Sequence, residues 1–291
     1  MEDRQYDLFF SVSRYKQAKD CLGKYYFQHV KKIKIPFIVW PGTLYGTVVH
    51  LLIENIIGLY NSDEDFRSGI IKYKNGELKK SPADKIVPDL FEKLYEEQYK
   101  IETDKKSFRK SRGFSKEETI KQARKWTPKI IDFMIKFVGL DNLTSEMKIT
   151  SDVDDLNMRI TSYIDLIKKE DESNIIYDIK NTKKPSGYFF KDWTKDIQSN
   201  VYIALLDIEK GLKPTQFGYL VFSIEDNLIF ANCIELNEDH IEESKKYLAS
   251  ATKELHDLHQ VASDTSFWSP DEERCNWCDF NLICQVTKKI R

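Results

Sequence analysis

The pattern of the chain changes near residue 144. From there it contains three runs rich in β-branched and aromatic residues, "TSEMKITSDV", "NMRITSYIDLIKK" and "NIIYDIKNT", joined by acidic, turn-rich connections. Such runs are typical of β-strands. The sequence then predicts a helix over about 192–210, two further strands in "TQFGYLVFSIE" and "NLIFANCIEL", and a last helix over about 238–260.

The part of the chain before these strands is predicted to be helical. Apolar periodicity and capping residues indicate helices over about 11–30, 43–60, 84–103 and 115–138, with a polar, irregular stretch over 62–82. The order of these elements favours an α/β (mixed α+β) fold, in which helices flank one central mixed β-sheet. We expect a single domain over 1–291, with a helical insertion at 62–140.

Composition narrows the class of protein. Hydrophobic residues make up 41% and charged residues 32% of the 291 residues, as in an ordinary globular protein with a substantial core. No apolar run reaches the ~18 residues that span a bilayer, and the start "MEDRQYDLFF" does not resemble a signal peptide. We therefore expect a cytoplasmic protein. Because the net charge is only −2, nucleic-acid binding would require a local basic patch.

One such patch is the segment "KKSFRKSRGFSKEE", in which two phenylalanines alternate with basic residues. The basic residues are Lys105, Lys106, Arg109, Lys110 and Arg112. A solvated loop is consistent with this pattern. So is a segment that binds a nucleic-acid backbone while Phe108 and Phe114 stack on bases.

Two neighbouring predicted strands carry carboxylates. Asp165 ends "TSYID", while Asp178 and Lys180 are two residues apart on the next strand and therefore face the same side of it. If these strands form a hairpin, the two carboxylates converge at one end of the sheet. Mg²⁺ and Mn²⁺ prefer oxygen ligands, and a neighbouring lysine can orient or deprotonate a water. A buried Asp–Lys ion pair also accounts for Asp178 and Lys180.

Two predicted helices carry polar residues at helical spacing. His50 lies four residues after Gly46 and four before Glu54, so His50 and Glu54 share a helix face. Gln198 and Tyr202 are also four residues apart. Taken singly, a histidine in the core and an ordinary amphipathic helix explain these pairs.

The five cysteines are unevenly distributed. Cys275, Cys278 and Cys284 cluster near the end of the chain, Cys21 lies in the first predicted helix, and Cys233 lies in a strand and is typical of a core residue. An odd number of cysteines argues against a disulfide framework. Four thiols suit zinc or an iron–sulfur cluster, and the spacing fits either.

In combination, these residues resemble the RecB-like branch of the PD-(D/E)xK nuclease superfamily, particularly its iron–sulfur members. Those members include CRISPR-associated adaptation exonucleases and the nuclease domain of AddB. The resemblance extends from Ser11 to Cys284. Its motifs occur in the family's order as Cys21 with Tyr25 and Tyr26, Gly46 with His50, Glu146, Asp165, Asp178 with Lys180, Gln198 with Tyr202, and Cys275, Cys278 and Cys284. Many relatives have glycine three residues before the motif aspartate, where this chain has Ser162.

The resemblance implies a restriction-endonuclease-like core and a role for each motif. The implied ligands of Mg²⁺ or Mn²⁺ are His50, Asp165, Asp178 and the carbonyl group of Ile179. Lys180 would position or activate a water, and Gln198 and Tyr202 would orient Lys180 or contact DNA. Lys183 and Lys184 would contact phosphates.

The resemblance also implies a role for the cysteines. Cys21, Cys275, Cys278 and Cys284 would hold a 4Fe–4S cluster, with Zn²⁺ as the alternative. Either group would join the segment 266–291 to Cys21.

The implied function is that of a Mg²⁺- or Mn²⁺-dependent DNA exonuclease acting on single strands or DNA ends. It would work in recombination, repair, replication or CRISPR adaptation, in a prokaryotic cell or a phage-infected host. A helicase, an integrase or a recombination protein is a candidate partner, and the chain has no G-x-x-x-x-G-K-[ST] motif of its own. The alternative is a nuclease-fold module that binds DNA or recruits a partner without turnover.

Overall fold

The computed structural model describes most of the chain. The described residues are 5–34, 41–104, 115–171, 173–182, 184–189, 191–223, 228–268, 271, 275–276, 278–281 and 283–284.

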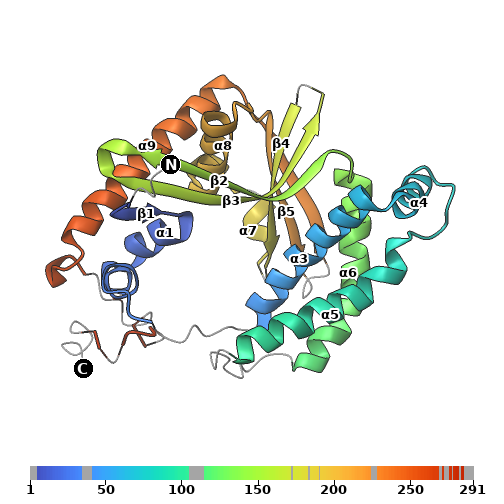
Figure 1. Cartoon of the computed structure of the whole chain (residues 1–291), viewed down its shortest axis with the longest axis horizontal. Helices are drawn as coiled ribbons and strands as arrows, with labels where there is room; N and C mark the ends of the chain where they lie inside the picture. Colours follow the sequence, from blue (N-terminus) through green and yellow to red (C-terminus); the bar gives the residue numbers. More distant parts are fainter. Residues whose placement is uncertain are drawn as a thin grey trace.

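Six strands among these residues form one mixed sheet (Figure 1). They are β1 (Leu8–Phe10), β2 (Leu143–Val153), β3 (Met158–Glu170), β4 (Ser173–Asn181), β5 (Gln216–Ser223) and β6 (Leu228–Glu235). Their order is β1-β3-β4-β5-β6, and β2 also pairs with β3. The pairs β1–β3 and β4–β5 are parallel and the others antiparallel. The predicted mixed sheet is therefore confirmed, as is the hairpin of β3 and β4.

Strand β3 changes partner along its length. It pairs with β2 from Met158 to Lys168, with β1 only up to Ile160, and with β4 only from Leu166 onward. The second edge of β3 therefore has no described strand partner between 161 and 165. At the end of this stretch, β3 and β4 separate.

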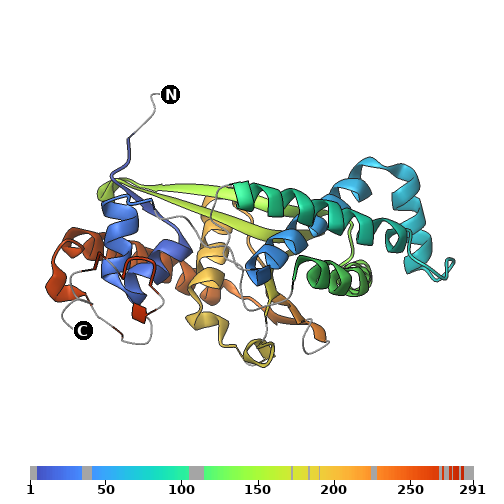
Figure 2. The same ribbon diagram turned by 90° about the horizontal axis from the view of Figure 1, so that it is seen from below.

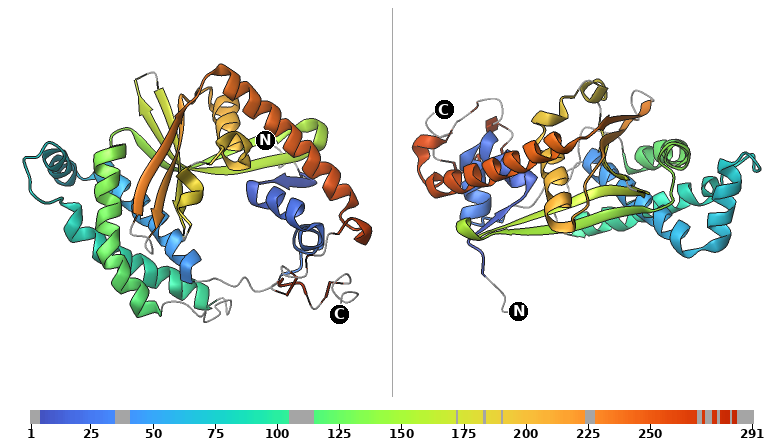
Figure 3. Two further views of the ribbon diagram at one scale, coloured as in Figure 1. Left: turned by 180° about the vertical axis from the view of Figure 1, so that it is seen from behind. Right: turned by 90° about the horizontal axis from the view of Figure 1, so that it is seen from above.

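Helices cover both faces of the sheet (Figures 1 and 3). They are α1 (Val12–Asp20), α2 (Leu22–Tyr25), α3 (Pro41–Ser62), α4 (Glu64–Lys74), α5 (Ala83–Asp104), α6 (Lys116–Phe133), α7 (Ser186–Phe189), α8 (Ile197–Lys210) and α9 (Glu238–Val261). Helices α3 to α6 share one hydrophobic core with the sheet, and α1, α2, α8 and α9 share a second. Successive side chains of β4 point to opposite faces of the sheet, so this strand contributes to both cores. Tyr177 packs in the first core and Ile176 in the second.

The stretch 62–82, predicted to be irregular, contains helix α4, so that prediction was wrong. The Asp63 side chain accepts a hydrogen bond from the Phe66 N–H at 2.9 Å and caps the start of the helix. Phe66 and Ile70 are buried one turn apart. A helix with only two buried positions leaves a weak periodic signal in a polar sequence.

The helix predicted over 11–30 is interrupted at Cys21. This residue has extended backbone angles (φ −159°, ψ 104°), which end α1, and its Sγ accepts a hydrogen bond from the Lys24 N–H at 3.5 Å at the start of α2. A π-helical turn over Tyr26–Val30 follows. Both helices bury residues in the same core, so apolar periodicity does not reveal a break of one residue.

Two further elements differ from the prediction. The helix expected from 192 begins as a 3₁₀ turn over Trp193–Lys195, and α8 starts only after Asp196. Strand β1 was not predicted, because three residues are too few to show a period and its pairing with β3 is distant in sequence.

Candidate active site

Asp165 lies at the fork where β3 and β4 separate. The β3–β4 pairing ends at Leu166 and Tyr177, so Asp165 and Asp178 are the next residues along the two strands. The Ile179 N–H donates a hydrogen bond to Asp165 Oδ2 at 2.7 Å. In a continued β-ladder, a backbone carbonyl of β3 would accept this N–H. Here the Asp165 carboxylate accepts it, and the bond holds the carboxylate between β3 and β4.

A histidine and a glutamate meet Asp165 at this fork. His50 of α3 has its Nδ1 3.5 Å from Glu146 Oε1 and 3.8 Å from Asp165 Oδ1. One ligand atom from each of the three residues lies within 4.8 Å of the other two. The predicted ligands His50 and Asp165 are therefore together, and Glu146 of β2 joins them.

Glu146 has an unusual backbone conformation. Its φ of 49° lies in the left-handed region, which is rare for residues other than glycine. The β2–β3 register pairs Ser145 with Leu166 and Met147 with Ile164, and omits Glu146 and Asp165 between them. The register is the same on both sides of this gap, so the ladder is interrupted at Glu146 and Asp165 without an inserted residue, and both carboxylates lie near His50.

The D-x-K pair lies on the other strand of the fork. Asp178 is fully buried, and Lys180 Nζ lies 2.6 Å from its Oδ2. Lys180 Nζ also donates to Gln198 Oε1 at 3.1 Å, and Gln198 Nε2 donates to the Tyr202 hydroxyl at 2.7 Å. Helix α8 thus supplies a chain of polar groups that ends on the Lys180 ammonium.

Burial and charge shift the pKa values of these groups. Burial raises the pKa of Asp178 to about 7, against the opposing effect of Lys180. Burial also raises the pKa of Asp165, although His50 and the Ile179 N–H oppose it. Burial lowers the pKa of Lys180, but Asp178 outweighs burial and the net shift is upward, so Lys180 is an ammonium at neutral pH.

A buried aspartate that the sequence analysis missed caps the helix of Gln198. Asp196 Oδ1 accepts a hydrogen bond from the Gln198 N–H at 3.4 Å, and its Oδ2 accepts one from Lys191 Nζ and one from the Tyr219 hydroxyl, each at 2.6 Å. Lys191 Nζ also lies 4.7 Å from the centre of the Tyr219 ring. The missed signal was an aspartate two residues before the glutamine, which is a typical cap position.

A family model described as the PD-(D/E)XK nuclease superfamily matches residues 9–285. The chain belongs to this superfamily. Among solved structures it is similar to a protein of Eubacterium rectale provisionally designated an exonuclease, with 13% identity over 97% of this chain and 88% of that one, and a TM-score of 0.47. It is also similar to SSO0001, with 12% identity over 94% of this chain and 95% of that one, and a TM-score of 0.35. No curated protein matches significantly.

Nucleases of the PD-(D/E)XK superfamily use divalent metal ions, and the residues at the fork suit one. Both side-chain oxygens of Asp178 are buried: Oδ2 lies 2.6 Å from the Lys180 ammonium, whereas Oδ1 has no hydrogen-bond donor among the described residues. A buried carboxylate oxygen without a donor favours a cation. With His50 and two more carboxylates nearby, the donor set is mainly oxygen, as Mg²⁺ and Mn²⁺ prefer. Asp178 itself is not one of the three residues that share the 4.8 Å cluster.

Within the described part of the chain, the cysteine thiols do not form a cluster like that of His50, Glu146 and Asp165. Among the described residues, no three cysteine sulfurs lie within 4.8 Å of one another, so a shared metal group is not supported here. They do lie in one part of the molecule: Cys21 and Cys275 are close enough to Cys278 to favour a higher pKa of its thiol, which burial raises most. Cys278 and Cys284 pack against the core of α1, α8 and α9.

The remaining predicted contacts with nucleic acid are mostly beyond the described residues. Lys184 is exposed just after β4, and its N–H donates to Thr182 Oγ1 at 3.0 Å. The five basic residues of the segment 105–112 and also Lys183 lie outside the described residues.

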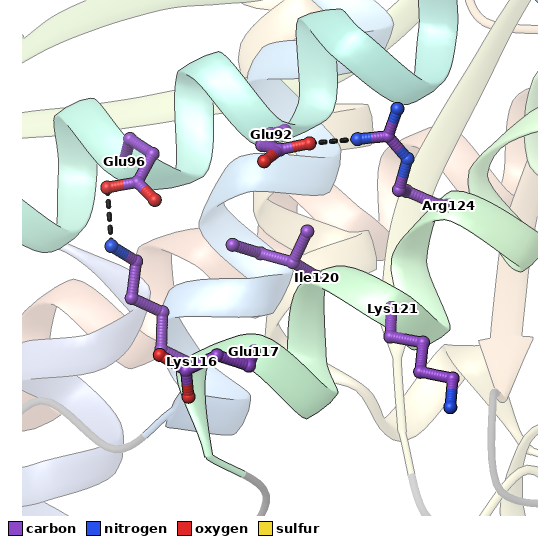
Figure 4. A pocket seen from close by; sticks show the side chains of 7 residues that line it. All are labelled: Glu92, Glu96, Lys116, Glu117, Ile120, Lys121 and Arg124. Carbon is purple, nitrogen blue, oxygen red and sulfur yellow. Dashed lines mark hydrogen bonds and ion pairs between the residues drawn. The ribbon is translucent and has the colours of Figure 1, made fainter.

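A polar groove between α5 and α6 lies away from the fork (Figure 4). Two of its cations are paired: Lys116 with Glu96 at 2.6 Å, and Arg124 with Glu92 and, at 2.7 Å, with Asp89. Glu117 and Lys121 also line the groove. No helix among the described residues is long and apolar enough to cross a membrane.

Proposed function

We propose that the chain is a Mg²⁺- or Mn²⁺-dependent deoxyribonuclease that acts as an exonuclease on single strands or DNA ends. The observation that carries this proposal is the group of His50, Glu146 and Asp165 at the fork, beside the buried pair of Asp178 and Lys180, in a chain of a nuclease superfamily. A metal ion and a neighbouring cation both stabilise the charge that develops in phosphodiester hydrolysis, and residues that could supply both lie together here.

His50, Asp165, Asp178 and the Ile179 carbonyl would hold the metal ion, with Glu146 as a further ligand or as the acceptor that orients His50. A bound ion would polarise the phosphate and lower the pKa of its water. Glu146 and Asp165 outweigh the effect of burial and raise the pKa of His50, which shows how strongly negative the fork is. A divalent cation relieves that repulsion.

Lys180 would orient the attacking water and stabilise the charge that develops on the phosphate. Because its pKa is raised, it enters the reaction as an ammonium and donates hydrogen bonds rather than accepting a proton. Gln198 and Tyr202 would hold it in place, since their hydrogen bonds restrict its position. The proton of the attacking water would then pass to a carboxylate or to solvent.

The test is digestion of single-stranded, duplex and circular DNA labelled at either the 5′ or the 3′ end, with Mg²⁺ or Mn²⁺. We expect Lys180→Ala and Asp178→Ala to lower the rate by at least about a hundredfold. The matched control is Lys213→Ala, because Lys213 pairs with Glu238 on the surface, away from the fork. Normal digestion by a folded Lys180→Ala protein would refute the assigned site. DNA binding without any digestion would favour a module that lacks turnover.

We also propose that a metal group joins the segment 266–291 to Cys21, with a 4Fe–4S cluster as the first candidate and Zn²⁺ as the alternative. The support is the resemblance together with the position of the four cysteines in one corner of the molecule. Anaerobic purification followed by iron, sulfide and zinc analysis distinguishes the two. A protein with neither metal would contradict both.

The wider assignments are proposals of the same kind. We propose one nuclease domain over 1–291 with 62–140 as an insertion, a cytoplasmic location, and a helicase, an integrase or a recombination protein as partner. Lys184, Lys183 and the basic segment would contact the phosphate backbone. Ala substitutions in the basic segment should weaken DNA binding and reduce its salt dependence.

A further inference from the structure

Beyond the fork, the hairpin of β2 and β3 has one face that contributes no side chain to either hydrophobic core. Ile160 and Ile164 of β3 pack in the core of α1, α8 and α9, so the alternate residues of the strand point the other way. Figure 2 shows this ribbon nearly edge-on, with α1, α8 and α9 all on one side of it. The residues that point away from these helices are Arg159, Thr161 and Tyr163 of β3, and their register partners Asp152, Thr150 and Lys148 of β2.

The residues of this face nearest the fork are an aromatic ring and a cation. Tyr163 is 50% exposed and lies directly opposite Lys148, which is also exposed. Neither side chain has a hydrogen bond or an ion pair with the described part of the chain. Tyr163 precedes Asp165 by two residues, about 6.6 Å along a strand.

A second exposed aromatic ring lies at the far end of the face. Phe9 of β1 is opposite Arg159 and is 42% exposed. The guanidinium of Arg14 lies 5.6 Å from the centre of the Phe9 ring, and Arg159 pairs with Asp152 at 2.9 Å. Thr150 and Thr161 lie between this end of the face and Tyr163. An aromatic ring and a cation therefore lie at each end of the face, and Tyr163 is at the end next to the fork.

We propose that this surface, the ribbon face of Phe9, Lys148, Arg159 and Tyr163, binds single-stranded nucleic acid that enters the fork. The proposal rests on the nuclease function proposed above. A base of a single strand presents a free face that can stack on Tyr163 or Phe9, whereas the bases of a duplex are already stacked. The unpaired ammonium of Lys148 complements a phosphate. Threonines and charged side chains separate the two rings, so the face is not a continuous apolar patch. A second copy of the chain would therefore fit this face poorly.

The first test measures binding of a fluorescein-labelled single-stranded oligonucleotide with Ca²⁺ in place of Mg²⁺. We expect Tyr163→Ala to raise Kd at least fivefold. We expect Lys148→Ala to weaken binding and to reduce the slope of log K against log salt by about 0.7. Phe137→Ala is the matched control, because Phe137 is 53% exposed on the π-helical turn after α6, and its Kd should equal that of the wild type.

The second test separates the ribbon face from the catalytic site. Bis(p-nitrophenyl) phosphate has one phosphodiester and no nucleobase or neighbouring phosphate, so the Tyr163→Ala variant should hydrolyse it with Mn²⁺ at close to the wild-type rate. A wild type that hydrolyses neither this diester nor DNA overturns the proposed function. A wild type that hydrolyses both, with unchanged oligonucleotide binding by Tyr163→Ala, overturns the ribbon face alone.

A third test detects contact directly. Irradiation of the wild-type complex with a 5-iodouracil-substituted oligonucleotide should give a cross-linked peptide that contains Tyr163. If Tyr163→Ala weakens duplex binding as much as single-strand binding, the preference for single strands is contradicted.

The oligomeric state tests the remaining occupant. If the wild type is a dimer that Tyr163→Ala dissociates, with DNA binding unchanged, the face binds a second copy of the chain.

Discussion

At the scale of single residues, the fork depends on a glutamate held in a left-handed conformation. The φ of 49° at Glu146 costs about 1 kcal/mol relative to a relaxed strand residue. The residue lies at an interruption between two well-paired stretches of β2 and β3. The Glu146 carboxylate in this conformation lies beside His50 and Asp165. Backbone strain at a negatively charged cluster is consistent with a metal site.

Two substitutions of Glu146 separate its carboxylate from its backbone. Glu146→Gln keeps the strained backbone and removes the charge, so we expect Mn²⁺ affinity to fall about tenfold or more with little change in Tm. Glu146→Gly also removes the charge but tolerates positive φ, so Tm should stay the same or rise by a few degrees. Calorimetric titration with Mn²⁺ and thermal unfolding without metal provide the measurements. Unchanged Mn²⁺ affinity in both variants would exclude Glu146 from the site.

The sequence indicated the chemical types of the site residues better than their contacts. The spacing of Asp178 and Lys180 predicted a shared face, and their 2.6 Å contact agrees with it. The approach of Glu146 to His50 could not be predicted from local patterns, because it brings β2 against α3, which is distant in sequence, at an interruption of the β2–β3 pairing. Local periodicity carries no information about such a contact.

At the scale of elements, Asp196 connects helix α8, which carries Gln198, to strand β5. Asp196 Oδ1 caps the helix that carries Gln198, and Oδ2 accepts the Tyr219 hydroxyl of β5 and the Lys191 ammonium. Burial alone would raise the pKa of Asp196, but the hydrogen bonds from Lys191 and Tyr219 outweigh it and lower that pKa. The charged form is therefore the one that the folded state stabilises.

We expect Asp196→Ala to destabilise the protein by about 2–4 kcal/mol. The loss of a cap costs about 1 kcal/mol, and the Tyr219 hydroxyl is left buried without its partner. Activity should also fall, since Gln198 no longer holds Lys180 firmly. Asp192→Ala is the control, because Asp192 caps only the exposed 3₁₀ turn one step earlier. Urea unfolding of both variants measures the difference, and equal losses would contradict a special role for Asp196.

The same residue gives a pH dependence with a definite sign. The unfolded chain binds a proton at Asp196 at higher pH than the folded protein does, because the folded pKa is lowered. The stabilising contribution of Asp196 is therefore present above about pH 4 and is lost as the pH falls further. We expect the difference in Tm between the wild type and Asp196→Asn to shrink from pH 6 to pH 3. A difference that grows in acid would contradict this assignment.

The elements were predicted best where they are long and bury one face. The runs of β2 to β6 and helices α3, α5 and α9 lie close to their predicted ranges, because each shows a clear apolar period. The failures are short or locally interrupted elements. Strand β1 has three residues, α4 buries two, and α1 stops at a single extended residue, Cys21. Tertiary contacts decide such features.

At the scale of the whole molecule, the two ends of the chain meet in one corner. The π-helical turn after α2 stacks Phe27 on Phe280 with ring centres 5.4 Å apart and packs it edge-on to Trp268 at 5.3 Å. Gly23 lies so close to Trp268 that a Cβ there would lie 2.8 Å from the indole ring. The Tyr25 hydroxyl shares a hydrogen bond with His259 Nδ1 at 2.9 Å. An apolar core therefore joins the ends beside the cysteines.

This core makes the end of the chain part of the fold, whether or not the cysteines bind a metal group. Trp268 is only 7% exposed, and its indole N–H donates to the Ala262 carbonyl at 2.9 Å. We expect Trp268→Ala to destabilise the metal-free protein by about 3–5 kcal/mol, since it empties a large site and exposes the surface of α2. Phe267→Ala is the matched control, because Phe267 is 55% exposed and should cost less than about 0.5 kcal/mol. Urea unfolding with a chelator present measures both. If Trp268→Ala costs no more than Phe267→Ala under these conditions, the apolar contacts do not hold the ends together, and stability there depends on metal binding by the cysteines.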